Sequence, residues 1–131
     1  MWMLDTNICI YIIKRKPLQV LERLRALEVS EVAISSLTLA ELEFGVAKSG
    51  RPRENSDALA AFIAPLEILP FDEAAASAYG PIRAALERAG KPIGSLDMLI
   101  AAHAVSRGCT LVTNNEREFA RVPAIKLENW V

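Results

Sequence analysis

The chain has 131 residues, of which 52% are hydrophobic and 24% charged, a composition typical of a folded globular domain and unlike that of a disordered protein. Lysines and arginines number 15 and aspartates and glutamates 16, so the net charge is −1 at pH 7. This balance excludes a nucleic-acid binder that works by bulk positive charge, but not one that contacts a polyanion through a few local groups. The length predicts one domain, over residues 1–131.

The predicted strands and helices alternate along the chain. Strands are expected over residues 1–4, 31–35, 67–71, 110–113 and 124–127, where short apolar or β-branched runs end at polar residues. Helices are expected over 7–14, 17–27, 36–49, 55–66, 73–90 and 95–107, with a short one after residue 115. Gly50, Pro52 and Asn55 are expected to break the pattern between the third and fourth helices. The alternation predicts an α/β layer structure around a mostly parallel sheet.

Capping residues and prolines predict several helix ends. Asp72 and Ser95 suit the N-cap position, and Gly108 suits a C-terminal stop. Pro17 suits the first position of the second helix. Pro81 is expected to kink or interrupt the alanine-rich helix that contains it.

The apolar runs, cysteines and histidine exclude several other classes of protein. No apolar run approaches the ~20 residues of a membrane-spanning helix or resembles a signal peptide. Cys9 and Cys109 lie in apolar surroundings and do not suggest a disulfide framework. With His103 as its only histidine the chain has too few soft ligands for a zinc site, and we interpret His103 as structural. We therefore expect a cytoplasmic protein with no membrane association.

Acidic residues follow the predicted strands or lie in the helices that come next. Asp5 directly follows the first strand, Asp97 lies in the first turn of a helix, and Glu116 and Glu118 follow the fourth strand together with the amide Asn115. Each has a simpler explanation as a helix cap or a solvated helix start. Together they suggest a shared site, because parallel sheets place their sites at the carboxyl ends of the strands.

The third predicted helix offers two candidate acids. Glu41 and Glu43 lie about 200° apart on a helix, so both cannot face one cleft. Both have apolar neighbours at helical spacing, so periodicity alone does not choose between them.

A cluster of carboxylates would require a cation. Two carboxylates ~5 Å apart repel by about 3 kcal/mol at an effective dielectric constant near 20. Oxygen ligands with few histidines or thiols favour Mg²⁺ or Mn²⁺. A metal-bound water that attacks a phosphodiester is the chemistry that suits such a site.

Four segments resemble the PIN-domain family and, more narrowly, the VapC-type ribonuclease toxins of toxin–antitoxin pairs. They are MLDTNICIY at 3–11, SLTLAEL at 36–42, DMLIAAHA at 97–104 and TNNEREF at 113–119. The resemblance covers residues 3–130, and four motifs in this order make a specific pattern. It implies a three-layer α/β/α fold and a Mg²⁺-dependent endoribonuclease activity in which Mn²⁺ can substitute. It also implies an RNA substrate, inhibition by a VapB-type antitoxin, and a homodimer.

The resemblance also assigns site residues. Asp5 and Asp97 match the metal-binding aspartates, and Glu41, rather than Glu43, matches the third acid. Many relatives have an aspartate where this chain has Asn115, so either Asn115 or Glu118 completes the site, and the number of metal ions stays open.

Two hydroxyl residues and one amide also match the family pattern. Thr6 and Thr113 match hydroxyls that orient the site carboxylates or waters, and Asn7 matches a polar residue at the rim.

Two other functions compete with a ribonuclease as interpretations of these acids. A non-catalytic RNA-binding or regulatory module would keep the acids only as helix caps. A phosphatase with a strand-end aspartate nucleophile needs a second acid two residues later, and this chain has Asn7 there.

Overall fold

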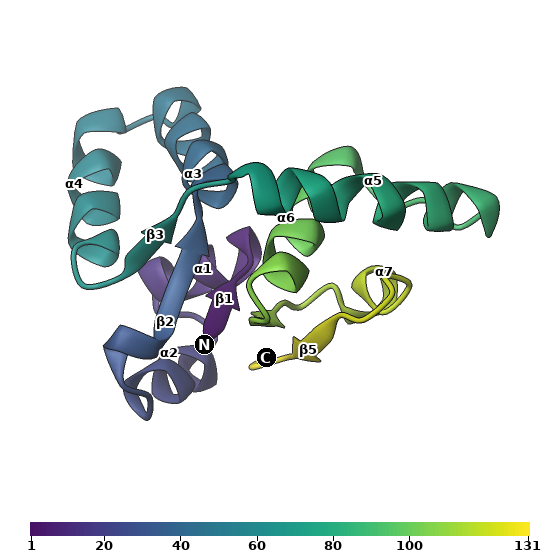
Figure 1. Cartoon of the computed structure of the whole chain (residues 1–131). Helices are drawn as coiled ribbons and strands as arrows, with labels where there is room; N and C mark the ends of the chain where they lie inside the picture. The colour runs from purple at the N-terminus through teal and green to yellow at the C-terminus, as the bar shows by residue number, and fades with distance from the viewer.

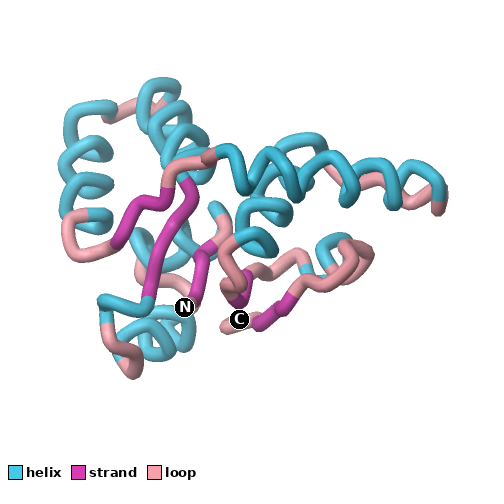
Figure 2. Tube along the Cα trace, viewed as in Figure 1, coloured by secondary structure: helices cyan, strands magenta, loops and turns pink.

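One parallel sheet of five strands forms the centre of the computed structural model, which describes residues 1–131 (Figures 1 and 2). The strand order is β3-β2-β1-β4-β5, and every neighbouring pair is parallel. The elements in chain order are β1 (Trp2–Leu4), α1 (Thr6–Lys14), α2 (Leu18–Arg25), η1 (Val29–Glu31), β2 (Val32–Ser35), α3 (Ser36–Lys48), α4 (Pro52–Ile63), β3 (Glu67–Leu69), α5 (Glu73–Arg88), α6 (Ser95–Ser106), β4 (Thr110–Val112), α7 (Glu116–Phe119) and β5 (Lys126–Glu128). The predicted α/β class is confirmed.

The two faces of the sheet carry separate hydrophobic cores, because successive side chains of a strand point to opposite faces. Met3 and Leu111 pack with α5 and α6, whereas Leu4 and Val112 pack with α1 to α4. The helices therefore form two layers, with the sheet between them (Figure 1). None of the helices is both long and apolar enough to cross a membrane.

Several predicted element boundaries were wrong or shifted. Helix α4 begins at Pro52 and not at residue 55. Proline is favoured in the first helical turn because the N–H groups there have no acceptor within the helix, so the lack of one costs no hydrogen bond. Pro17 precedes α2 as its N-cap rather than lying in its first position. Gly94, not Ser95, is the N-cap of α6. The last strand is Lys126–Glu128 rather than 124–127, and Ala124 has a left-handed backbone with φ of 63°.

Pro81 does not interrupt α5, which runs unbroken from Glu73 to Arg88. Both Pro81 and Ser77 are exposed, so the Ser77 carbonyl that loses its helical donor can bond to water. Further along the helix, Ile82 and Leu86 are buried in the core that α5 shares with α6. This packing holds the helix together across the proline.

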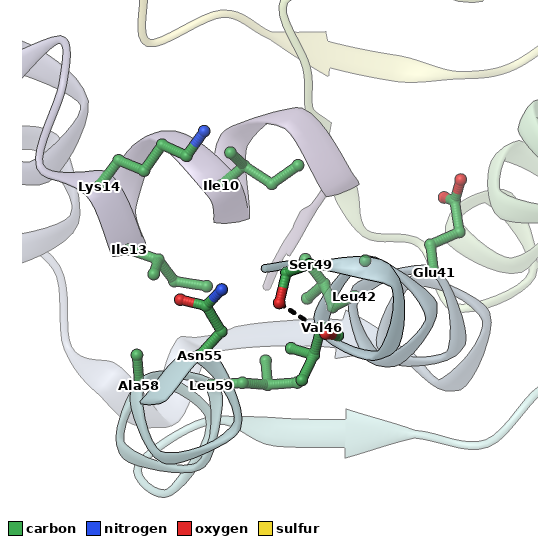
Figure 3. Close-up of a pocket in the computed structure, with 11 residues that line it drawn as sticks. Ile10, Ile13, Lys14, Glu41, Leu42, Val46, Ser49, Asn55, Ala58 and Leu59 are labelled. Carbon is green, nitrogen blue, oxygen red and sulfur yellow. Dashed lines mark hydrogen bonds between the residues drawn. The ribbon is translucent and has the colours of Figure 1, made fainter. Parts of the chain in front are cut away.

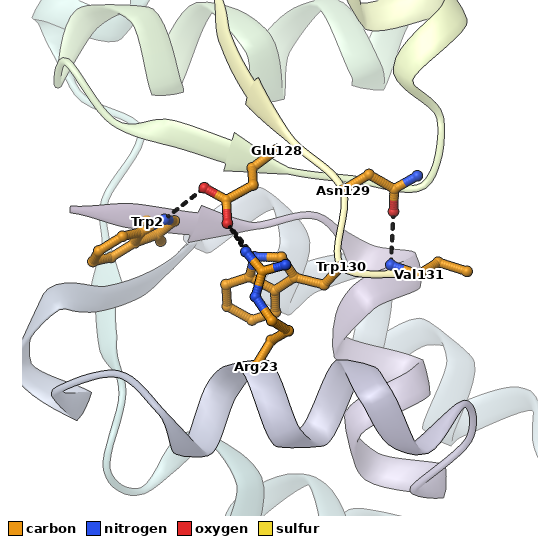
Figure 4. Close-up of polar contacts among 6 residues, drawn as sticks. All are labelled: Trp2, Arg23, Glu128, Asn129, Trp130 and Val131. Carbon is orange, nitrogen blue, oxygen red and sulfur yellow. Dashed lines mark hydrogen bonds and ion pairs between the residues drawn. The ribbon is translucent and has the colours of Figure 1, made fainter.

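A polar cluster around Glu128 fastens the end of the chain to the rest of the fold (Figure 4). The indole N–H of Trp130 donates to Glu128 Oε1 at 2.9 Å, and that of Trp2 donates to Glu128 Oε2 at 3.2 Å. Arg23 of α2 forms an ion pair with the same carboxylate and lies 5.8 Å from the centre of the Trp130 ring. The Trp130 side chain is buried and the half-buried Trp2 packs against the same core, so both tryptophans serve in packing.

Replacing Glu128 is expected to destabilise the fold. Glu128→Ala leaves the buried Trp130 N–H without an acceptor and Arg23 without its partner, which should lower the free energy of unfolding by about 2 kcal/mol. Glu54→Ala, which breaks an exposed ion pair with Arg51 on α4, is the control and should cost less than about 0.5 kcal/mol. Urea denaturation measures both; equal losses would contradict the role given to Glu128.

Candidate active site

The site forms where β1 and β4, neighbours in the sheet, both end. Leu4 is paired with Val112, so the next residues of the two strands, Asp5 and Thr113, lie side by side. The backbone N–H of Asp5 donates to the Val112 carbonyl at 2.9 Å, and Thr113 Oγ1 donates to Asp5 Oδ2 at 2.8 Å. Sheet pairing thus joins two residues that are 108 positions apart in the sequence.

Asp5 has two local roles. Its Oδ1 accepts a hydrogen bond from the Thr6 backbone N–H at 2.8 Å, so it is the N-cap of α1, and its side chain is buried in the acidic site. Burial raises the pKa of Asp5, against the hydrogen bonds from Thr113 and Thr6, and the charge of Glu41 raises it further. The capping and acidic-site interpretations of Asp5 therefore both hold.

Helix α3 directs one of its two glutamates to this site. Thr6 Oγ1 donates to Glu41 Oε1 at 2.5 Å, which joins the start of α1 to the middle of α3. Glu43 is exposed. The structure therefore brings Glu41 to Asp5 and leaves Glu43 in solvent, a choice that helical periodicity did not make.

Asp97 comes to the same place from the first turn of α6. Its pKa is raised to about 6, chiefly by burial and then by the negative charges of Asp5, Glu118 and Glu41. A Cβ atom on Gly94, the N-cap, would lie 3.4 Å from Asp97 Oδ2, an ordinary van der Waals distance, so Gly94 directly borders the carboxylate. Acids from four separate segments thus act on one another electrostatically.

Asn115 and Glu118 form the fourth side of the acidic site. The Asn115 backbone N–H donates to Thr113 Oγ1 at 2.9 Å, and its side-chain Nδ2 donates to Glu118 Oε2 at 3.2 Å. Thr113 therefore bridges Asn115 and Asp5. Glu118 supplies the carboxylate on this side, and Asn115 orients it.

The donor atoms fit a hard divalent cation. All the charged groups are carboxylates, and their mutual repulsion is what a cation would relieve. No three acidic, histidine or cysteine side chains lie close enough to enclose an ion by themselves. This arrangement is compatible with Mg²⁺, which keeps several waters and usually takes only one or two protein carboxylates plus substrate oxygens.

A buried contact that the sequence did not indicate joins α6 to the β2–α3 junction. His103 Nδ1 lies 2.7 Å from Ser35 Oγ, which also accepts from the Leu37 backbone N–H as the N-cap of α3. The His103 side chain is fully buried and burial lowers its pKa. The residue links the helix of Asp97 to the helix of Glu41 from outside the acidic cluster, in agreement with a structural role.

An apolar pocket of about 300 Å³ lies beside the acidic site, between α1, α3 and α4 (Figure 3). Glu41 forms one end of it, and Ile10, Ile13, Val46 and Leu59 line its walls. It is open to solvent and therefore available to a partner.

The parallel sheet with acids at its carboxyl edge defines an α/β domain of the acidic-nuclease type. The PIN-domain family model matches residues 2–125, and the chain belongs to this family.

Relatives cover the whole domain. A tRNA(fMet)-specific endonuclease VapC from Salmonella typhimurium is 50% identical, over 98% of this chain and 97% of the relative. The crystal structure of VapBC2 from Rickettsia felis bound to a promoter DNA fragment contains a chain that is 44% identical, with a TM-score of 0.94 and coverage of 99% and 98%. DNA-bound VapBC from Salmonella typhimurium gives the same TM-score at 48% identity, with coverage of 99% and 98%. The predicted resemblance to VapC-type proteins is confirmed.

Removing one acid from the cluster should stabilise the metal-free protein. The pKa of Asp97 is about 6 in the folded protein, against a reference value of 3.8. Ionisation of Asp97 therefore lowers the free energy of unfolding as the pH rises through this interval, and the loss is complete by pH 7. Asp97→Asn should therefore raise the free energy of unfolding at pH 7 by about 1 kcal/mol, a value reduced for partial solvent exposure.

Urea denaturation in EDTA between pH 4 and 7 tests this expectation. The gain should shrink as the pH falls toward 4, whereas Asp57→Asn, on the exposed face of α4, should show no such trend. A variant less stable than the parent at pH 7 would contradict the repulsion inferred for Asp97.

Proposed function

We propose that this protein is an endoribonuclease toxin of a type II toxin–antitoxin system that hydrolyses RNA phosphodiester bonds with a divalent metal ion. The observation that carries the proposal is the convergence of Asp5, Glu41, Asp97 and Glu118 at one edge of a PIN-family sheet. A non-catalytic module would need the acids only as caps. Glu41 lies in mid-helix and caps nothing, and this favours the enzyme.

The metal would be held by Asp5 and Asp97. PIN-family nucleases are generally metal-dependent, and we propose Mg²⁺ as the ion, with Mn²⁺ as a substitute. When bound, the ion would lower the pKa of a coordinated water and neutralise charge on the phosphate. The hydrogen bonds from Thr6 and Thr113 fix the direction of the Asp5 carboxylate.

Glu41 and Glu118 would act beside the metal ligands. Glu41 Oε1 accepts from Thr6, which leaves Oε2 to orient the attacking water and take its proton. Glu118 is held by Asn115 and would complete the negative pocket. We therefore propose Glu118 as the fourth acid, with Asn115 as the residue that positions it.

The substrate we propose is initiator tRNA. The relative from Salmonella typhimurium, at 50% identity, is named for cleavage of tRNA(fMet). Loss of this tRNA would stop translation and growth, as expected of a toxin. The place of action would then be the cytoplasm.

The partner we propose is a VapB-type antitoxin that docks in the apolar pocket between α1, α3 and α4. The similar solved structures are VapBC complexes. The pocket is apolar and ends at Glu41, so a segment seated in it would reach the acidic site (Figure 3). Occupation of the pocket would therefore block the substrate.

Two glutamates on one helix provide a matched test of the activity. Glu41→Gln should lower the rate of cleavage of initiator tRNA by at least about 100-fold, because it removes the proposed proton acceptor. Glu43→Gln, which makes the same change on the exposed face of α3, should cleave within about twofold of the parent.

Both variants are assayed with Mg²⁺ and with EDTA, and circular dichroism checks their folding. Cleavage that persists in EDTA would contradict metal dependence. A folded Glu41→Gln protein with parental activity would remove Glu41 from the mechanism.

Two alanines of α4 test the docking of the antitoxin. Ala58 lines the apolar pocket and Ala60 does not, although both are exposed. Ala58→Arg should fill the pocket and weaken binding of the antitoxin encoded beside the gene by at least about 100-fold, or ~2.7 kcal/mol, while Ala60→Arg leaves it unchanged. Calorimetric titration measures both affinities; equal affinities would place the antitoxin elsewhere.

A further inference from the structure

A second open pocket, of about 430 Å³, has a basic lining. It lies between the C-terminal end of α5 and the segment that contains α7. Its lining residues are Ala85, Leu86, Ala89, Lys91, Arg117, Ala120, Arg121 and Pro123. Three of these are cations and none is an acid.

The three cations have no carboxylate partner within the chain. The ion pairs of the structure are Arg23–Glu128, Arg51–Glu54 and Arg83–Glu87. Of the three, only Arg121 makes a side-chain hydrogen bond, from Nη1 to the Pro92 carbonyl at 3.3 Å. Like charges that share a concave surface without counter-charges create a positive potential there, and this potential attracts an anion.

The two segments that line this pocket also carry residues in or beside the acidic site. On α7, Arg117 lines the basic pocket, while its neighbour Glu118 bonds to Asn115 and acts on Asp97. Lys91 lies in the loop between α5 and α6, which ends at Gly94 beside the Asp97 carboxylate. Both segments therefore lead from the basic pocket to the acidic site within a few residues.

We propose that this basic pocket binds a backbone phosphate of the substrate RNA, away from the phosphate that is cleaved. The inference rests on the proposed ribonuclease function and adds to it the site that holds the substrate. Guanidinium groups present paired N–H donors that match phosphate oxygens. The acidic site itself repels RNA, and with a net charge of −1 the molecule as a whole does not attract it, so binding requires local cations.

An acidic peptide of the antitoxin is the other anion that could use these cations. Phosphate is favoured by position, since Arg117 adjoins an acid of the active site in the sequence. The apolar pocket proposed for the antitoxin lies in the other helical layer, with α1, α3 and α4.

The test compares two double variants that remove the same charge. Lys91→Gln/Arg117→Gln changes the basic pocket. Arg25→Gln/Arg107→Gln changes two exposed and unpaired arginines that precede β2 and β4, at the opposite edge of the sheet. All four side chains are exposed, so folding should be unaffected.

Initiator tRNA transcript is the probe, and its cleavage is measured over a range of KCl concentrations. The pocket variant should raise KM about 10-fold with kcat within twofold, and reduce the slope of log KM against log salt by about 1. The control variant should leave both unchanged. Lys91→Arg/Arg117→Lys, which keeps the charges, should retain a KM within about threefold of the parent.

Each other outcome overturns the inference. If the two glutamine variants change KM equally, the change results from the net charge of the protein and not from the basic pocket. If the pocket variant binds the antitoxin more weakly in a calorimetric titration while its KM for RNA is unchanged, the pocket binds an acidic peptide of the antitoxin. If the parent protein cleaves no RNA, the proposed function fails and the inference fails with it. If the parent cleaves RNA and the two glutamine variants behave alike, only the proposed role of the basic pocket is refuted.

Discussion

The pairing of β1 with β4 is the constraint on which the rest of the site depends. It places the buried Asp5 carboxylate where Thr113 Oγ1 can donate to one oxygen, while the first N–H of α1 donates to the other. Two fixed donors hold the carboxylate in a single orientation inside the protein. A buried carboxylate without these bonds would be strongly destabilising, so the geometry of the sheet and that of the site cannot be separated.

The acids that surround Asp5 lower the free energy of unfolding by their mutual repulsion, and local hydrogen bonds offset part of this loss. Glu41 accepts from Thr6, and Glu118 accepts from Asn115, so each has one donor of its own. Asp97 accepts no hydrogen bond, and its pKa is raised chiefly by burial and then by the negative charges of Asp5, Glu118 and Glu41. Such strain is expected where a site is built to hold a cation, since a bound ion would reverse the sign of the interaction.

The net charge of −1 is the sum of surfaces that differ in charge. Acids gather at the carboxyl edge of β1 and β4, an apolar pocket lies on the α1 to α4 side, and unpaired cations gather where α5 approaches α7. These three surfaces correspond to the proposed metal, antitoxin and RNA. A protein of nearly neutral charge can therefore handle RNA, because neighbouring surfaces differ in sign.

The sequence by itself determined the alternation of strands and helices, the layered α/β class that follows from it, and the motifs that identify the family. These depend on local periodicity and on residues close in the chain. It misjudged Pro52 and Pro81, where the first-turn tolerance of proline and core packing outweighed the local preference, and it named Ser95 rather than Gly94 as the N-cap of α6.

Periodicity did not decide which acids meet; the family resemblance indicated Glu41, and the tertiary structure shows the contact that brings it to the site. Helical spacing left Glu41 and Glu43 equivalent, and the hydrogen bond from Thr6 separates them. Neither the contact between His103 and Ser35 nor the grouping of Lys91 with Arg117 has a signal in the sequence. The physical reason is that these contacts join segments brought together by sheet order and helix packing, whereas a linear pattern specifies only the face on which each residue lies.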